Sequence, residues 1–447
     1  MRTASRTARA ALREAITSRR SQPMPATMGD HAAIENLLAT VYHRSSPTEF
    51  QVQREDPFYE PSDRSVVKDG DQIVGHIRQA SRTMRFGEAR WPFGRLNYLA
   101  VLPEFRSRGV ANDLVRFAEQ RMREAGFAVG ELQTSETKVA IASGWIPCGG
   151  RVFSEASARD VLSQLALRCE RSKSEVLAPV RKRSKRLSVR LWRHVELPAV
   201  MRIYQANLNQ CFGALDRSED YWRWLIGRHA FDHIFVAIEG RDRLALEDGE
   251  SGIVGYAVVR DRHILEMFTD PEHPTVAIKL LGRACTDAIE QDHHAIRFHG
   301  PPDHPIHDLV SDANGGYFAT RPVRGTTTFV KILNPPDFAR FLSVDLLARL
   351  QTSELEVPVE LGMCVDGEKW HLTVDARGAT MKKGKLGRSY VTCDTATWTS
   401  LLLSCVDAKT AIDAGRLLPS TSLAAVVVQT LFSRDLMWRP PWDHLPA

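Results

Sequence analysis

The sequence predicts an α+β protein in which mixed central sheets are flanked by helices. Its 447 residues correspond to about two to four domains of ordinary size. Strand and helix patterns alternate through residues 22–170, and the same order of elements returns in residues 187–333. From Pro335 the pattern changes to a separate α+β unit that extends to residue 447. We therefore expect two similar domains followed by a different one.

The expected elements of the first segment begin with a helix over residues 33–42, which Asp30 can cap. A hairpin follows, with its turn at Asp69–Asp71. The later elements are a strand over residues 96–102, an amphipathic helix over residues 112–125 that ends at Gly126, and a strand over residues 127–132.

The second and third segments show patterns of the same kind. In residues 187–333, we expect strands at 188–192, 233–239, 253–259, 263–268 and 295–299, and helices at 197–207, 220–228 and 275–291. After Pro335, we expect helices at 336–342, 394–403 and 407–414, and strands at 357–365 and 370–375.

The composition is that of a soluble globular protein, with 43% hydrophobic and 25% charged residues. A net charge of +5 is too small to indicate a dedicated nucleic-acid binder. No apolar run reaches the ~18 residues that a membrane helix needs. Neither a nucleic acid nor a membrane is therefore an expected partner.

Part of the positive charge lies in two basic stretches. Residues 1–21 are rich in Arg, Ser and Ala and carry a single acid, Glu14. We expect a disordered basic leader or a start codon placed too early, although an organellar transit peptide has the same composition. The run Arg181–Arg186 indicates a linker or exposed loop, with a nucleic-acid or nuclear-import segment as the alternative.

Cysteine and histidine usage does not favour a metal site. The seven cysteines are odd in number and form no C-x-x-C pair, which argues against a zinc site and a disulfide framework and favours a reducing cytoplasm. Histidines and aspartates gather between residues 292 and 308, where a metal is conceivable. Three prolines in that stretch indicate a loop instead, so we expect no metal.

One motif carries chemistry. The sequence of residues 106–111 is Arg106-Ser107-Arg108-Gly109-Val110-Ala111, which fits a pattern of Arg or Gln, two residues, Gly, one residue, then Gly or Ala. It follows an apolar strand and opens an amphipathic helix, so small residues let a phosphate approach the first N–H groups of the helix. Arg106 and Arg108 add charge. We expect a pyrophosphate site, with an ordinary strand–helix turn as the alternative.

At these residues the sequence resembles the GNAT acyltransferase superfamily. The resemblance implies that acetyl-CoA binds here, with Leu99, Ala100 and Val101 against its pantetheine arm. The stretch from Arg106 to Asn112 would hold the phosphates. The thioester would lie beside Leu99, where an amine attacks directly without a covalent enzyme intermediate. Such a reaction needs a general base for the amine and a proton donor for the departing thiolate.

The whole layout resembles the enhanced-intracellular-survival (Eis) type of acetyltransferase. The resemblance implies an active GNAT domain at 22–170, a degenerate GNAT-like domain at 187–333, a sterol-carrier-like domain at 335–447, and a homo-oligomer, hexameric in that family. Three fragments support it. They are Leu132–Glu136, which includes the family's Ser-Glu pair and places Ser135 at the cofactor; Tyr221–Leu225, similar to an aromatic helix; and Val428–Phe432, similar to the terminal strand region.

The second domain is expected to lack the cofactor site. Its equivalent loop, residues 269–274, has no glycine, two acids and two prolines. Phosphate would be repelled there and would find few backbone N–H groups.

Two departures from the family concern catalysis. The family's proton-donating Tyr is replaced by Ala140, and the nearest large side chain, Trp145, cannot serve as that acid. The family often uses its C-terminal carboxylate as the base, but this chain continues past Phe432. The candidate bases are therefore the terminal carboxylate of Ala447, or Asp443 and His444, with a solvated tail as the alternative.

These expectations define an N-acetyltransferase that moves acetyl from acetyl-CoA to an amine of a small molecule or of lysine. One rival is a non-catalytic acyl-CoA-binding protein whose C-terminal domain binds a lipid or a partner. Another is transfer of an acyl chain longer than acetyl, which the pocket around Leu99 would decide.

Overall fold

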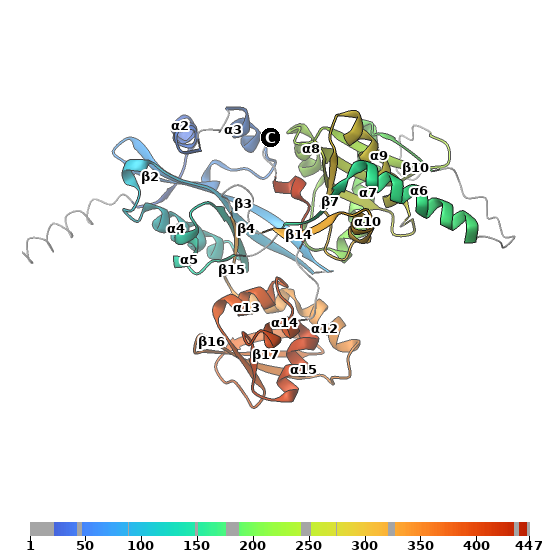
Figure 1. Cartoon of the computed structure of the whole chain (residues 1–447). Coiled ribbons are helices and arrows are strands. Elements are labelled where there is room, and N and C mark those ends of the chain that lie inside the picture. Colours follow the sequence, from blue (N-terminus) through green and yellow to red (C-terminus); the bar gives the residue numbers. More distant parts are fainter. Residues whose placement is uncertain are drawn as a thin grey trace, which may run out of the picture.

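A computed structural model describes the chain in nine stretches (Figure 1). These are residues 22–42, 47–87, 89–147, 151–175, 187–242, 252–273, 275–320, 327–432 and 438–444. The basic leader, the run Arg181–Arg186 and Ala447 lie outside them. Within these stretches, no helix has the length and apolar character needed to cross a membrane.

The first sheet has eight strands. Its order is β1 (Met24–Pro25), β2 (Arg64–Asp69), β3 (Gln72–Phe86), β4 (Ala89–Val101), β5 (Val129–Thr134), β15 (Thr327–Ile332) and β6 (Ile146–Pro147), and β9 (Phe212–Leu215) pairs with β3. Helices α2 (His31–Tyr42) and α3 (Pro47–Arg54) lie on one face, and α4 (Val110–Glu124) and α5 (Thr137–Ala142) lie on the other (Figure 1). The expected α+β class with mixed sheets flanked by helices is confirmed.

Close packing holds α4 on this sheet. The helix buries Leu114, Val115 and Met122 completely, as its periodicity predicts. A side chain at Gly94 would clash, because its Cβ would lie 2.1 Å from the sulfur of Met122. Gly126 has a left-handed φ of 77° just beyond the helix, in agreement with the expected C-cap.

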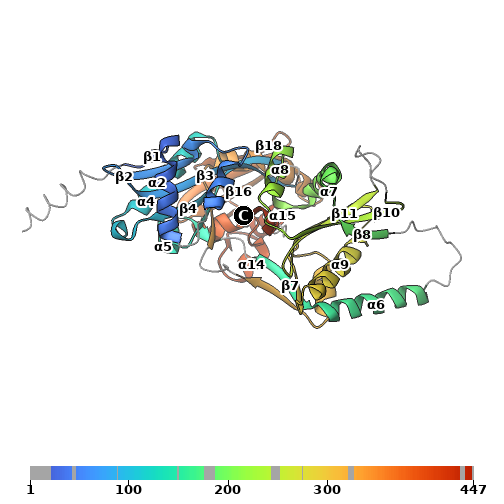
Figure 2. The ribbon, with the colours of Figure 1, turned by 90° about the horizontal axis from the view of Figure 1, so that it is seen from above.

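The second sheet has seven strands and the same general arrangement. Its order is β14 (Gly316–Thr320), β7 (Arg151–Ser157), β13 (Ala295–Phe298), β12 (His263–Thr269), β11 (Ile253–Arg260), β10 (His233–Glu239) and β8 (Leu187–Leu191). Its helices are α6 (Ala158–Glu175), α7 (Leu197–Asn207), α8 (Glu219–Gly227), α9 (Val276–Glu290) and α10 (Ile306–Asp312). Figure 2 shows the first and second sheets side by side.

Strand pairing crosses the boundaries expected from the sequence. β7 comes from the segment assigned to the first domain, yet it lies between β13 and β14 of the second sheet. Conversely, β15 comes from the segment assigned to the second domain but pairs with β5 and β6 of the first sheet. Each of these two sheets is therefore completed by the other's segment.

The third sheet forms a separate unit below the other two (Figure 1). Its strands are β18 (Gly378–Lys383), β17 (Glu368–Asp375), β16 (Val359–Val365), β19 (Tyr390–Cys393) and β20 (Leu418–Pro419). Its helices are α11 (Pro335–Phe341), α12 (Ser343–Gln351), α13 (Thr395–Leu402), α14 (Ala408–Asp413) and α15 (Ser422–Leu431).

Two expectations are corrected here. The fragment Val428–Phe432 is not a strand, because its first four residues lie in α15, where Ala424, Val427 and Leu431 share the buried face at helical spacing. The cysteines are not all free thiols either. Cys405 is disulfide-bonded, and its partner lies outside the described residues.

Candidate active site

The cofactor edge begins where two parallel strands separate. β4 and β5 pair from Phe93 opposite Val129 to Leu96 opposite Leu132. Beyond Leu96, β4 continues to Val101 without β5 beside it. The N–H of Leu102 donates to the carbonyl of Val74 on β3 (3.0 Å), so the alternation of an extended strand directs the N–H of Val101 toward the opening.

A bulge shapes β4 at this point. Tyr98 and Leu99 both lie opposite Ile77, and Tyr98 has a left-handed φ of 54°. The carbonyl of Tyr98 lies 2.9 Å from Nδ1 of His76, and the carbonyl of Leu99 accepts from the hydroxyl of Tyr42 (2.8 Å). Two side chains thus hold the backbone where Leu99, Ala100 and Val101 were expected to meet pantetheine.

The loop after β4 presents backbone N–H groups at the same edge. Ser107 and Gly109 have left-handed φ values of 59° and 88°, on either side of Arg108. Left-handed residues that alternate with ordinary ones turn successive N–H groups toward a common point, which suits an anion. The N-cap residue of α4 is Gly109, which has no side chain. No capping side chain therefore binds the N–H groups of the first helical turn.

A glycine brings this helix terminus close to the sheet. A Cβ at Gly75 on β3 would lie 2.7 Å from Cγ1 of Val110, the first residue of α4. The side-chain oxygen of Asn112, two residues further along α4, is buried and has no hydrogen-bond partner among the described residues. The edge therefore combines close packing, an uncapped helix terminus and an unsatisfied polar atom, all of which fit a large polar ligand.

The remaining expected cofactor residues lie around this terminus. The Nε of Arg106 lies 3.4 Å from the carbonyl of Val101, and Arg108 stacks over the ring of Phe105 at 4.9 Å. Ser135 is exposed just after β5. The structure thus brings the predicted set to the carboxyl ends of β4 and β5: Leu99, Ala100, Val101, Arg106, Ser107, Arg108, Gly109, Val110, Ala111, Asn112 and Ser135.

The position on α5 where the family resemblance implies a proton donor holds Ala140. Ala140 is fully buried, and the indole nitrogen of Trp145 donates to Glu119 (2.6 Å) inside the core. Tyr42, the last residue of α2, lies at the bulge instead. Burial raises the pKa of its phenol, and so do the nearby carboxylates of Glu136 and Glu49, so the hydroxyl keeps its proton.

Glu49 also faces the bulge. One of its carboxylate oxygens accepts a hydrogen bond from the hydroxyl of Tyr98 (2.8 Å). Sequence reasoning missed both Tyr42 and Glu49. The sequence offered one weak signal, since Tyr42 lies at the end of α2 and Glu49 in the first turn of α3. Both helices lie far from the motif Arg106–Ala111 in the chain.

The C-terminal segment reaches this region but does not present Asp443 as a base. The turn Pro441–His444 lies between the first two sheets (Figure 1), and Arg95 of β4 donates to the carbonyl of Asp443 (3.4 Å). The carboxylate of Asp443 pairs with Arg217 (2.9 Å), which also pairs with Glu266, and all three side chains are fully buried.

These contacts correct the expectation for Asp443, because a carboxylate held by a buried guanidinium is an anchor rather than a free proton acceptor. His444 ends the same turn, but its side chain lies outside the description, as does Ala447.

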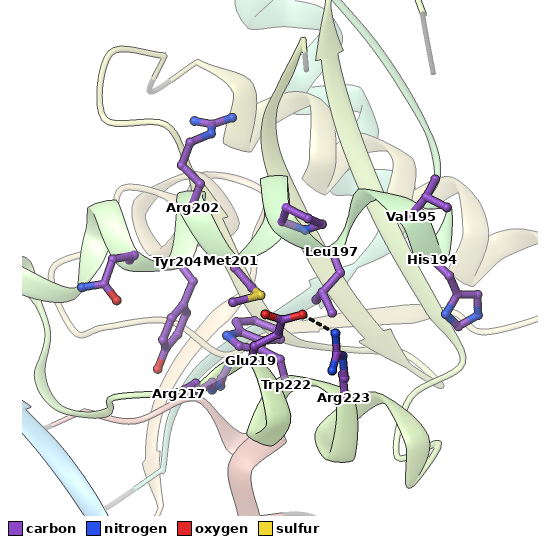
Figure 3. Close-up of a pocket in the computed structure, with 12 residues that line it drawn as sticks. His194, Val195, Leu197, Met201, Arg202, Tyr204, Arg217, Glu219, Trp222 and Arg223 are labelled. Carbon is purple, nitrogen blue, oxygen red and sulfur yellow. Dashed lines mark hydrogen bonds and ion pairs between the residues drawn. The ribbon is translucent and has the colours of Figure 1, made fainter. Parts of the chain in front are cut away.

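A cavity of about 550 Å³ lies elsewhere, between α7 and α8 of the second sheet (Figure 3). Leu197, Met201 and Trp222 give it an apolar side. Among its polar side chains, Glu219 and Arg223 pair with each other (Figure 3), whereas Arg202 donates to the carbonyl of Ile253. Arg217 links the cavity to Asp443 of the tail. The residues that line the cavity include none of the predicted cofactor residues, so the cavity is separate from the cofactor edge.

Comparisons with known proteins agree with the fold of this edge. Residues 22–148 match a family model described as an acetyltransferase (GNAT) domain. A search of curated protein sequences found no match. The matched segment contains β2 to β5 and the α4 loop, so this part of the first sheet is similar to a GNAT acetyltransferase domain.

Solved structures extend the likeness to nearly the whole chain. A GCN5-related N-acetyltransferase from Anabaena variabilis is 14% identical with a TM-score of 0.69, covering 94% of this chain and 98% of that one. A GCN5-related N-acetyltransferase from Kribbella flavida is 15% identical with a TM-score of 0.68, and the match covers 95% of this chain and 98% of that one. Eis1 from Mycobacterium abscessus is 13% identical with a TM-score of 0.61, and the match covers 92% of this chain and 96% of that one. At these identities, the likeness concerns the fold.

Proposed function

We propose that the protein is an N-acetyltransferase, in which the edge between β4 and α4 binds acetyl-CoA as a co-substrate. The observation that carries the proposal is the separation of β4 from β5 directly before a loop that gathers backbone N–H groups. The pyrophosphate would meet the N–H groups from Arg108 to Asn112. The pantetheine arm would lie along the open edge of β4 from Leu99 to Val101, and the N–H of Val101 would pair with one of its amides.

The chemistry is a direct transfer. The nitrogen of a neutral primary amine attacks the thioester carbonyl, the new C–N bond forms, and the C–S bond breaks as the tetrahedral intermediate collapses. The amine proton passes to a base, and the departing thiolate takes a proton from Tyr42. The phenol suits this task because it lies at the carbonyl of Leu99 and retains its proton.

For the base, the terminal carboxylate of Ala447 and the imidazole of His444 stay in the proposal. Glu49 joins them, because its carboxylate contacts Tyr98 at the bulge. The acceptor is an amine of a small molecule or of lysine.

The second sheet is proposed to be a GNAT-like unit that has lost its cofactor site. In its support, β12 and β13 pair in parallel only at His263 and Ile264, and Leu265 forms a bulge like that of β4. The loop after β12 uses its own N–H groups internally, since Glu272 and His273 both donate to Asp270. A phosphate would be repelled by the carboxylates of Asp270 and Glu272, and the nearby Arg202 already pairs with Asp270 (3.7 Å).

The third unit and the homo-oligomer are proposed on the resemblance alone, and the cytoplasmic location is proposed on the cysteine usage. The third unit is proposed to be sterol-carrier-like, and the oligomer to be a hexamer.

A non-catalytic acyl-CoA-binding protein is the second candidate, favoured by Ala140 at the position of the family's acid. An amine panel with acetyl-CoA separates the two candidates, with release of the CoA thiol and the mass of the amine as readouts. Acetylated product with wild type supports the enzyme, and binding without any product supports the second candidate. Adding longer acyl-CoA donors tests the preference for acetyl.

A further inference from the structure

The β4 bulge is connected to a buried positive charge. Arg64 on β2 is completely buried, and no carboxylate of the described residues forms an ion pair with it. Its guanidinium contacts three neutral groups: Nη1 lies 3.2 Å from Nε2 of His76, Nη2 donates to Gln53 (2.8 Å), and Nε donates to the hydroxyl of Tyr59 (3.1 Å). An unpaired buried cation is costly, so its retention calls for a role.

Arg64 remains charged at neutral pH. Burial, together with repulsion from Arg78, lowers its pKa to about 10. Phe50 stabilises the cation from one side, with its ring centre 4.3 Å from the guanidinium carbon. The charge is therefore held in place without an anion to neutralise it.

The contacts fix the tautomer of His76. A guanidinium has only donors, so Nε2 of His76 must accept, and the proton of the neutral ring must lie on Nδ1. The ring is neutral because burial, followed by Arg64, lowers its pKa well below the usual value. Nδ1–H then donates to the carbonyl of Tyr98 (2.9 Å).

The carbonyl of Tyr98 belongs to the same peptide as the N–H of Leu99. This peptide is trans, so the two groups point in opposite directions. Holding the carbonyl therefore sets the direction of that N–H. Hydrogen bonds in a chain polarise one another, so the charge of Arg64 makes the N–H of Leu99 a stronger donor.

We propose that Arg64 and His76 are positioning residues, which aim and polarise the N–H of Leu99 toward the oxygen of the reacting thioester. The inference rests on the proposed function, since it places the thioester beside Leu99. Negative charge develops on that oxygen when the amine attacks, and a preorganised donor stabilises it most in the transition state.

His76 offers a matched pair of variants. In His76→Asn the amide nitrogen can replace Nδ1 as donor, whereas in His76→Gln the longer chain places its amide near the position of Nε2. We expect His76→Gln to lower kcat about tenfold with KM for acetyl-CoA nearly unchanged, and His76→Asn to retain most of kcat. Arg64→Met should lower kcat like His76→Gln, and Arg64→Lys should recover part of it.

The infrared stretching frequency of the thioester carbonyl tests the inference, because a purely structural role of these residues would leave that frequency unchanged. Acetyl-CoA labelled with ¹³C at that carbon is bound to each variant without an amine. We expect a lower frequency for acetyl-CoA bound to wild type than for acetyl-CoA in solution. In His76→Gln and Arg64→Met the frequency should rise part of the way toward the solution value, and in His76→Asn it should equal the wild-type value.

The outcomes are distinguishable. An unchanged frequency in His76→Gln and Arg64→Met, with acetyl-CoA bound, would overturn the inference while the proposed function stands. Equal changes in His76→Asn and His76→Gln would assign the effect to packing and also overturn it. No binding of acetyl-CoA by wild type would overturn the proposed function, and this inference with it.

Discussion

The hydroxyl of Tyr42 lies where β4 and β5 separate, and it donates a hydrogen bond to the carbonyl of Leu99. If it protonates the departing thiolate, Tyr42→Phe should lower kcat about 10- to 100-fold and leave acetyl-CoA affinity within about twofold. The measurement is steady-state kinetics with calorimetry of acetyl-CoA. Tyr390→Phe, in the third sheet, is the control and should behave as wild type. An unchanged kcat in Tyr42→Phe would remove Tyr42 from the mechanism.

Residues of the site differ in how well the sequence revealed them. The motif Arg106–Ala111 is contiguous and follows an apolar strand, so its place at a helix terminus could be predicted. Tyr42, Arg64 and His76 come from three different elements, and only the pairing of β2, β3 and β4 brings them to the bulge. The tail candidate Asp443 was wrong because its partner Arg217 could not be inferred without the tertiary fold.

At the scale of elements, β15 completes the first sheet, although it follows the strands of the second sheet in the chain. Phe329 in β15 is fully buried in the core of the first sheet. We expect Phe329→Ala to lower the free energy of unfolding by about 3–5 kcal/mol, since it empties a close-packed site. Urea unfolding gives the value.

Phe318→Ala in β14 is the matched control, because that ring is 45% exposed. Its loss should be clearly smaller. Equal losses in the two variants would contradict the assignment of β15 to the core of the first sheet.

Long periodic elements were predicted well. The helices α4 and α9 and the strands β10 to β13 lie within a few residues of their expected ranges. The exchange of β7 and β15 was not predicted, because hydrophobic periodicity identifies a strand but does not say which sheet it joins. The same limit explains Val428–Phe432, whose short apolar run suits either a strand or a buried helix.

At the scale of the whole molecule, the tail joins the first two sheets through Asp443. Asp443→Asn should lower the free energy of unfolding by about 1–3 kcal/mol, because Arg217 then keeps only Glu266 as a charged partner. Chemical denaturation measures it. Asp413→Asn, which breaks an exposed pair with Lys409, should change stability by less than about 0.5 kcal/mol. A similar small effect at Asp443 would show that the tail is not an anchor.

Acid should destabilise the second sheet. Burial, with repulsion from Arg297 and Arg262, lowers the pKa of His263 to about 4, and burial with repulsion from His307 does the same for His304. Below about pH 6.5 the unfolded chain binds protons that the folded chain does not, so stability falls as pH decreases toward 4. Unfolding free energies at several pH values should show this slope, and His263→Gln should reduce it. A slope unchanged by that substitution would contradict the assignment.

The central claim is that acetyl-CoA binds at the N-terminus of α4, and calorimetry on two glycine variants tests it most directly. Gly109→Asp places a carboxylate at the phosphate site, while Gly126→Asp places one at the other end of the same helix, also at a left-handed φ. The second site is open, with no atom within 4 Å of an added Cβ, so it controls for backbone strain. We predict that wild type and Gly126→Asp bind acetyl-CoA and that Gly109→Asp does not. Binding by Gly109→Asp with wild-type affinity would contradict the account.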